Sequence, residues 1–182
     1  MAYGVLIESM IQAKNIDALN RSVKAEIDVD GGNLIALTAP TEQGNDVWTA
    51  SAPITGKLGN LWIAYNPCVK YTVVNGKKFA GLSADNRDYT NIKGEVFDAF
   101  EPVVGDEIIV TIDDVDATGA SAVAGDILES KNGQTKFTRV AGGTATSGST
   151  AFQIEWVGTV DFPKAGIGID KVKAFKAVCV QA

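Results

Sequence analysis

The segment Tyr71-Thr-Val-Val-Asn-Gly-Lys-Lys-Phe-Ala80 gives the clearest local structural signal in the chain. Residues 71–74 and 77–80 are short runs that contain β-branched or aromatic side chains, and Asn75-Gly76 lies between them. Asn-Gly favours a two-residue type I′ turn because both central residues of that turn have positive φ. The segment therefore predicts a β-hairpin with a two-residue connection.

Similar strand and turn signals continue toward the N-terminus. Residues 25–29 alternate in polarity, Asp30-Gly31-Gly32-Asn33 is a turn sequence, and residues 34–38 are largely apolar. Together these three stretches predict a second hairpin. Residues 46–50 and 61–65 predict two further strands.

Turns also recur at short intervals in the C-terminal half of the chain. This spacing is typical of sandwiches and barrels and leaves no room for successive βαβ units. We therefore predict an all-β fold, an antiparallel sandwich or barrel-like single domain with long loops over residues 23–182. The strands expected in this half are residues 95–100, 107–112, 126–129, 134–140, 151–160 and 171–180.

Residues 1–22 are interpreted as an N-terminal arm. A helical stripe could be formed by Leu6, Ile7, Met10, Ile11 and Ala18, but residues 3–7 could equally form an edge strand. The arm is expected to pack either on its own domain or on a neighbouring subunit. The residues expected at an interface with a partner protein or another subunit, one of them outside the arm, are Tyr3, Val5, Leu6, Ile7, Met10, Ile11 and Trp48.

The acidic composition limits the possible functions. The chain has 182 residues, a net charge of −6 and a pI of about 4.6. Nucleic acids and anionic membranes attract clustered Lys and Arg, so neither is an expected partner. The absence of histidine excludes Ser-His-Asp and Cys-His catalysis and imidazole metal sites. We expect a binding protein without cofactor or metal, not an enzyme.

The two cysteines, Cys68 and Cys179, are expected to be buried free thiols. Two thiols alone do not form a structural zinc site, and one bridge is not a secreted disulfide framework. The N-terminus lacks the features of a signal peptide, and no stretch approaches the roughly 20 apolar residues that span a bilayer. The sequence therefore predicts a soluble protein made in the cytoplasm.

Two kinds of short acidic motif bear on function. Asp113-Asp-Val-Asp116 resembles the start of a calcium loop, but the twelfth position from Asp114 is Gly125 instead of glutamate. A solvated acidic loop is therefore expected. Val103-Val-Gly-Asp106 and Val123-Ala-Gly-Asp126 both place Gly-Asp before an expected strand, which predicts two similar turns.

Aromatic residues leave a carbohydrate-binding module as one alternative. Trp62 and Trp156 lie within expected strands, so core or interface packing is their expected role. Trp48 is the tryptophan expected to be exposed. A hydrolase that uses two carboxylates and no histidine is a further alternative.

Several segments occur in a characteristic order: 25–37, 46–48, 50–53, 100–106, 123–126, 132–136 and a long strand ending near residues 175–180. This order resembles that of tailed-bacteriophage capsid decoration (cement) proteins, over most of residues 24–180. The resemblance implies a virion protein that binds the outside of the expanded capsid, with the major capsid protein as partner and self-association as a trimer. It transfers no catalytic or ligand residues. Another phage structural protein, such as a tail-tube or head-fibre component, is the alternative.

Overall fold

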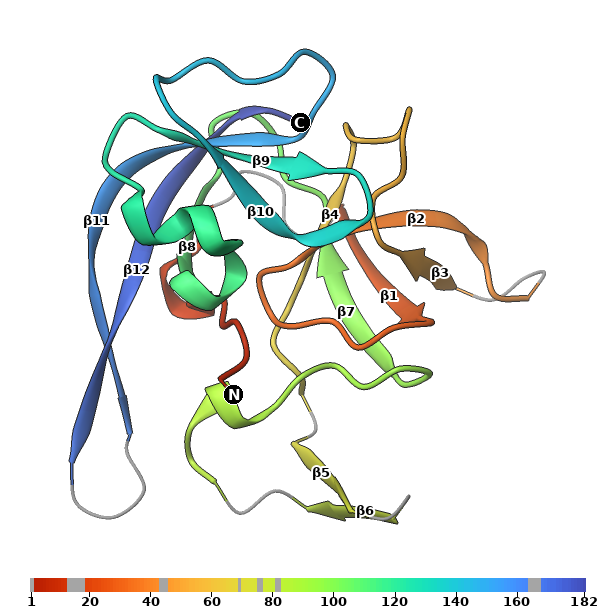
Figure 1. Cartoon of the computed structure of the whole chain (residues 1–182). Helices are drawn as coiled ribbons and strands as arrows, with labels where there is room; N and C mark the ends of the chain where they lie inside the picture. The colour runs from red at the N-terminus through yellow and green to blue at the C-terminus, as the bar shows by residue number, and fades with distance from the viewer. Residues whose placement is uncertain are drawn as a thin grey trace.

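The predicted all-β class is confirmed by the structure (Figure 1), a computed structural model that describes residues 2–12, 19–42, 46–68, 70–74, 77–80, 83–163 and 168–182. Within these ranges the helical segments are short 3-10 turns. They are η1 (Glu8–Met10), η3 (Asn86–Asp88), η4 (Ile112–Asp114) and η5 (Ala117–Ser121).

Five strands close into a barrel in the order β1-β3-β2-β4-β7. They are β1 (Asn20–Ala25), β2 (Leu34–Pro40), β3 (Val47–Ser51), β4 (Trp62–Ala64) and β7 (Val96–Phe100). β1 completes the barrel because it pairs with β7 on one side and with β3 on the other. The β1–β3 pair is parallel, which departs from the expected antiparallel arrangement, and the other barrel pairs are antiparallel.

The hairpin predicted over residues 25–38 is wrong. β1 ends at Ala25, and β2 pairs with β3 and β4 instead of residues 25–29. The turn itself is present, because the Asn33 N–H donates to the Asp30 carbonyl at 3.2 Å. A turn signal is local, whereas the partners of β1 and β2 are determined by which apolar faces the closed barrel buries.

Five further strands form an antiparallel sheet in the order β10-β9-β11-β12-β8. They are β8 (Glu107–Thr111), β9 (Ile127–Lys131), β10 (Gln134–Val140), β11 (Ala151–Pro163) and β12 (Ile169–Gln181). On β11, β9 pairs only with residues 151–153, and on β12, β8 pairs only with residues 174–178. The distal part of the β11–β12 hairpin therefore extends beyond its neighbours as a two-stranded ribbon (Figure 1).

The two Gly-Asp motifs form similar turns on opposite edges of this hairpin, as predicted. The Gly105 N–H donates to the Cys179 carbonyl at 2.8 Å, and the Cys179 N–H donates to the Asp106 carbonyl at 2.7 Å. The glycine and aspartate of residues 123–126 make the same pair of bonds to Ile154, both at 2.8 Å. Both glycines have positive φ, 95° and 92°, which explains why glycine is needed there.

The hairpin predicted over residues 71–80 is confirmed. β5 (Tyr71–Val74) and β6 (Lys77–Ala80) form a separate two-stranded sheet. Val74 pairs directly with Lys77, so two residues connect the strands. That connection, Asn75-Gly76, lies outside the described residues.

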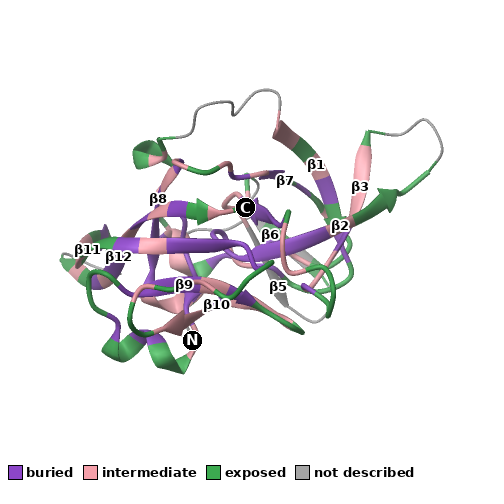
Figure 2. Ribbon diagram, turned by 90° about the horizontal axis from the view of Figure 1, so that it is seen from above, coloured by how far each residue is buried: buried purple, intermediate pink, exposed green. Residues whose placement is uncertain are grey.

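One hydrophobic core joins the barrel to the sheet. Its buried members include Leu34 and Phe100 from the barrel and Phe152 and Phe175 from the sheet. The rings of Phe152 and Phe137 meet edge to face, with centroids 5.7 Å apart. Figure 2 shows the buried residues, in purple, along strands of both sheets. The barrel and the sheet therefore pack against each other through a shared apolar interior.

Candidate interaction surface

The N-terminal segment, residues 3–12, lies along the edge of β8 that faces away from β12. Leu6 forms an isolated antiparallel bridge with Val110, and Gln12 forms one with Glu107. η1 lies between these two bridges. The segment therefore follows β8 as an irregular strand, which is closer to the edge-strand alternative than to the helical stripe.

A buried carboxylate anchors this segment. Asp114 is fully buried, and its Oδ2 accepts hydrogen bonds from the backbone N–H groups of Val5 and Thr111, both at 3.0 Å. Its Oδ1 accepts a hydrogen bond from Asn33 Nδ2 at 3.1 Å. Burial raises the pKa of Asp114 well above its usual range, and hydrogen bonds from Thr111 oppose that shift. The expected solvated loop is wrong for Asp114, because protein donors take the place of water there.

The expected interface residues of the arm have different environments. Val5 and Leu6 are each 1% exposed and pack in the core of their own chain, so the interface prediction fails for both. The reason is that Leu6 packs in the core beside Val110 of β8, whereas Val5 packs against Phe162 and Val172 of the β11–β12 hairpin. Met10 is 53% exposed on η1 and remains available for contact. The partly buried members are Tyr3, Ile7 and Ile11.

The expected boundary of the arm also needs correction. β1 begins at Asn20, so residues 20–22, which were assigned to the arm, belong to the barrel. Residues 13–18 lie outside the described part of the chain. Where the structure describes residues 1–22, they are packed on the domain of their own chain.

Trp156 is the main residue that the sequence misplaced. It is 45% exposed, so of the expected core or interface packing the core alternative is wrong and the interface alternative stays a prediction. An irregularity in the register between Ile154 and Trp156 is the physical cause, because a β-bulge changes the face to which the following side chain points. Trp62 is 9% exposed and packs in the barrel as expected. Trp48 is half-buried against the same cluster, so its expected exposure is wrong.

Two polar grooves lie beside the start of β1. One groove of about 550 Å³ is lined by Asp46 and Trp48. The other, of about 340 Å³, is lined by residues that include Glu8 and Tyr65. Residues 20–22 line both grooves. The structure therefore places η1 and Trp48, two elements of the expected interface, near the same strand.

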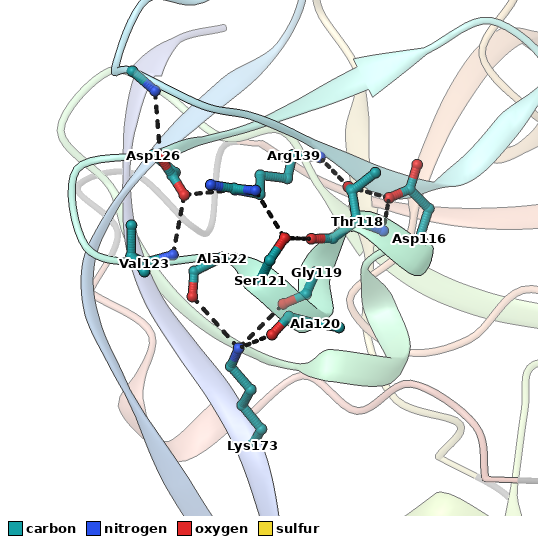
Figure 3. Close-up of polar contacts among 11 residues, drawn as sticks. Asp116, Thr118, Gly119, Ala120, Ser121, Ala122, Val123, Asp126, Arg139 and Lys173 are labelled. Atoms are coloured by element: carbon teal, nitrogen blue, oxygen red, sulfur yellow. Dashed lines mark hydrogen bonds and ion pairs between the residues drawn. The ribbon is translucent and has the colours of Figure 1, made fainter.

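A polar network covers the outer edge of β10 (Figure 3). Arg139 donates from Nε to Asp126 at 2.6 Å and from Nη1 to Ser121 Oγ at 2.8 Å. The Thr118 backbone N–H donates to Asp116 at 3.0 Å, and Thr118 Oγ1 accepts the Arg139 backbone N–H at 3.0 Å. Ser121 Oγ donates to the Thr118 carbonyl at 3.2 Å. The hydrogen-bond donors and acceptors of these residues pair with one another. The network therefore stabilises the edge of β10 and does not activate Ser121 as a nucleophile.

Lys173 links the same network to β12 (Figure 3). Its Nζ donates to the carbonyl oxygens of Gly119, Ala120 and Ala122 at 3.2, 2.9 and 3.4 Å. Carbonyls at the end of a helical turn carry partial negative charge, so an ammonium group stabilises them. This contact ties η5 to the projecting part of the β11–β12 hairpin.

The remaining candidate ligands for a metal ion are the acidic side chains and the two cysteines. Within the ranges that the structure describes, no three Cys, Asp or Glu side chains are grouped so that they could hold a metal ion. Both cysteines are free thiols. Cys179 is buried, which raises its pKa to about 11. Cys68 is exposed in the loop after β4, so its expected burial is wrong.

Comparison with known proteins identifies no relative of this chain. No family model, curated protein or solved structure matches it. Among the described residues, no helix has the length and apolar character needed to cross a membrane. Function must therefore be inferred from the residues and their geometry.

Proposed function

We propose that this protein is a virion structural protein that binds the outside of a tailed-bacteriophage capsid and stabilises the expanded shell. The observation that carries the proposal is the contrast between polar clusters and exposed apolar side chains. The networks around Asp114 and Asp126 have partners within the chain, whereas Met10 and Trp156 are 53% and 45% exposed. A surface of this kind suits association with another protein more than chemistry.

The order of sequence motifs that resembles capsid decoration proteins supports the same class. The proposed partner is the major capsid protein, and the proposed location is the capsid surface, after synthesis in the host cytoplasm. We propose a trimer as the assembled form. A protein that binds the expanded shell and not its free subunits stabilises that shell by mass action.

The test is co-sedimentation with expanded capsids that lack the protein, beside unexpanded shells and isolated capsid subunits. The protein should pellet with expanded capsids only, because a site shared by neighbouring subunits exists only in that lattice. It should also raise the temperature at which the particles rupture. If it neither pellets with expanded shells nor raises their rupture temperature, the capsid proposal is wrong.

A further inference from the structure

The register irregularity in β11 places two chemically different side chains on the outer face of the sheet. Ile154 pairs with Ala177 and is buried, and the next paired residue is Trp156, opposite Lys176. The Glu155 carboxylate lies 3.3 Å from the Lys176 ammonium group. Glu155, Trp156 and Lys176 therefore share one face, although the first two are adjacent in sequence.

Gly158 holds the indole of Trp156 in place. A Cβ atom at Gly158 would lie 1.8 Å from Trp156 Cζ2 and 2.1 Å from Cη2. The six-membered ring therefore lies against the backbone of Gly158, where only glycine leaves room for it. Trp156 nevertheless stays 45% exposed. The indole thus packs on the backbone of its own strand, while part of its surface remains exposed to solvent.

Two carboxylates pair with Lys176, the residue opposite Trp156 in the register. Lys176 Nζ is 2.7 Å from Glu107 Oε2 and 3.3 Å from Glu155 Oε2, so two carboxylates face one ammonium group. The Glu155 side chain is 44% exposed and can accept further hydrogen bonds. The patch has an excess of negative charge within a chain whose net charge is −6. Its charge complements a cationic partner.

Elsewhere in the chain, a similar combination of an aromatic ring and carboxylates is occupied by one of the chain's own arginines. The Arg87 guanidinium lies 4.8 Å from the centroid of the Phe162 ring. It also donates to Asp85 and Asp170, at 2.7 and 2.8 Å. One guanidinium thus covers an aromatic face and pairs with two carboxylates. At Trp156 the aromatic face and the neighbouring Glu155 carboxylate are present, but no arginine of the described residues covers the ring.

We propose that Trp156 and Glu155 form a docking point for an arginine side chain on a partner polypeptide. A guanidinium is planar and weakly hydrated, so it can stack on the indole and donate to Glu155 at the same time. A lysine ammonium cannot make both contacts with the same geometry. This inference does not depend on the partner being a capsid protein.

The test uses the three tryptophan indole N–H signals in ¹H–¹⁵N spectra of the full-length protein, assigned with single Trp→Phe variants. The probe is a blocked Gly-Arg-Gly-Arg-Gly peptide, compared with versions that carry lysine or the uncharged isostere citrulline. The Trp156 signal should shift with the arginine peptide, more weakly with lysine and least with citrulline. The Trp48 and Trp62 signals should not follow the titration.

Two variants separate the roles of charge and ring. E155Q should weaken the arginine response by about 2- to 5-fold, as expected for an exposed charge pair, and W156L should abolish saturable binding. E26Q removes an exposed carboxylate elsewhere and should bind as the parent does. The proposal is overturned if citrulline acts as well as arginine, if E155Q has no effect in a spectrum that shows an intact fold, or if an oligosaccharide shifts the Trp156 signal and the arginine peptide does not.

Discussion

Asp126 Oδ2 lies 2.6 Å from Arg139 Nε, and the two side chains are only 6% and 20% exposed. Burial by itself would raise the pKa of Asp126. Hydrogen bonds from Arg139 and from the backbone N–H groups of Val123 and Gly142 outweigh burial, so the pKa is lower than usual. The pair connects the start of β9 to β10 and makes the sheet edge sensitive to acid.

Replacing Arg139 with methionine should lower the free energy of unfolding by about 1.5–3 kcal/mol at pH 7, the range for a hydrogen bond to a charged group. Because the folded pKa of Asp126 is lowered, its stabilisation is present above the unfolded pKa of about 3.9 and is lost as pH falls through the folded value. Urea unfolding at pH 7 and pH 3 should therefore show a smaller difference at pH 3. K93M, at an exposed lysine, is the control, and an equal effect of R139M at both pH values would contradict this account.

The turn that contains Asp126 could be predicted because its signal is local. Gly125 supplies the positive φ, and the Asp126 side chain accepts the Val123 N–H at 3.0 Å, within four consecutive residues. Strands bounded by such turns could be predicted for the same reason. The strand with which each one pairs could not be predicted in this way. The parallel pairing of β1 with β3 depends on the closure of the whole barrel, which no short segment encodes.

The candidate surface was harder to predict than the fold for the same reason. Alternation along residues 151–160 places Trp156 on the buried face, and one bulge is enough to reverse that assignment. Val5 and Leu6 carry apolar side chains that fit a core or an interface equally well. Only the neighbouring edge of β8 decides between these roles, and that edge is about one hundred residues away in sequence.

Alanine at Gly158 should displace the Trp156 indole, because its Cβ would overlap the ring. We expect G158A to reduce stability and to change the near-ultraviolet circular dichroism. In a W156A background the same substitution should be neutral or stabilising, because glycine in a strand costs about 0.5–1 kcal/mol relative to alanine. A double-mutant cycle from urea unfolding should give a coupling of at least about 0.5 kcal/mol. Additive effects would mean that the ring does not rest on Gly158.

Thiol reactivity should distinguish the two cysteines. The thiolate is the reactive form, and Cys179 is buried with its pKa raised to about 11, whereas Cys68 is exposed. A thiol reagent at pH 8 should modify one site in the native protein, and mass spectrometry should identify it as Cys68. The denatured, unreduced protein should give two thiols. Rapid labelling of both sites in the native state would contradict the burial of Cys179, and no thiols after denaturation would indicate a disulfide.

Point substitutions in the N-terminal segment should separate folding from attachment, which a deletion of residues 1–20 cannot do because it removes Leu6 from the core. L6A should destabilise the protein by about 2–5 kcal/mol, as is usual for a buried leucine. M10A should change stability by less than about 0.5 kcal/mol, because Met10 is 53% exposed. Thermal and urea unfolding of both variants measure this contrast.

Under the capsid proposal, M10A should weaken co-sedimentation with expanded shells while its unfolding curve stays that of the parent. The reason is that η1 is fixed to β8 by the bridges on either side of it, so Met10 is presented at a constant position. I27A, which removes a 40% exposed side chain from the loop after β1, serves as the matched control and should bind normally. If M10A binds shells as tightly as I27A and the parent, η1 is not part of the contact. If L6A unfolds like the parent, the assignment of the N-terminal segment to the core is wrong.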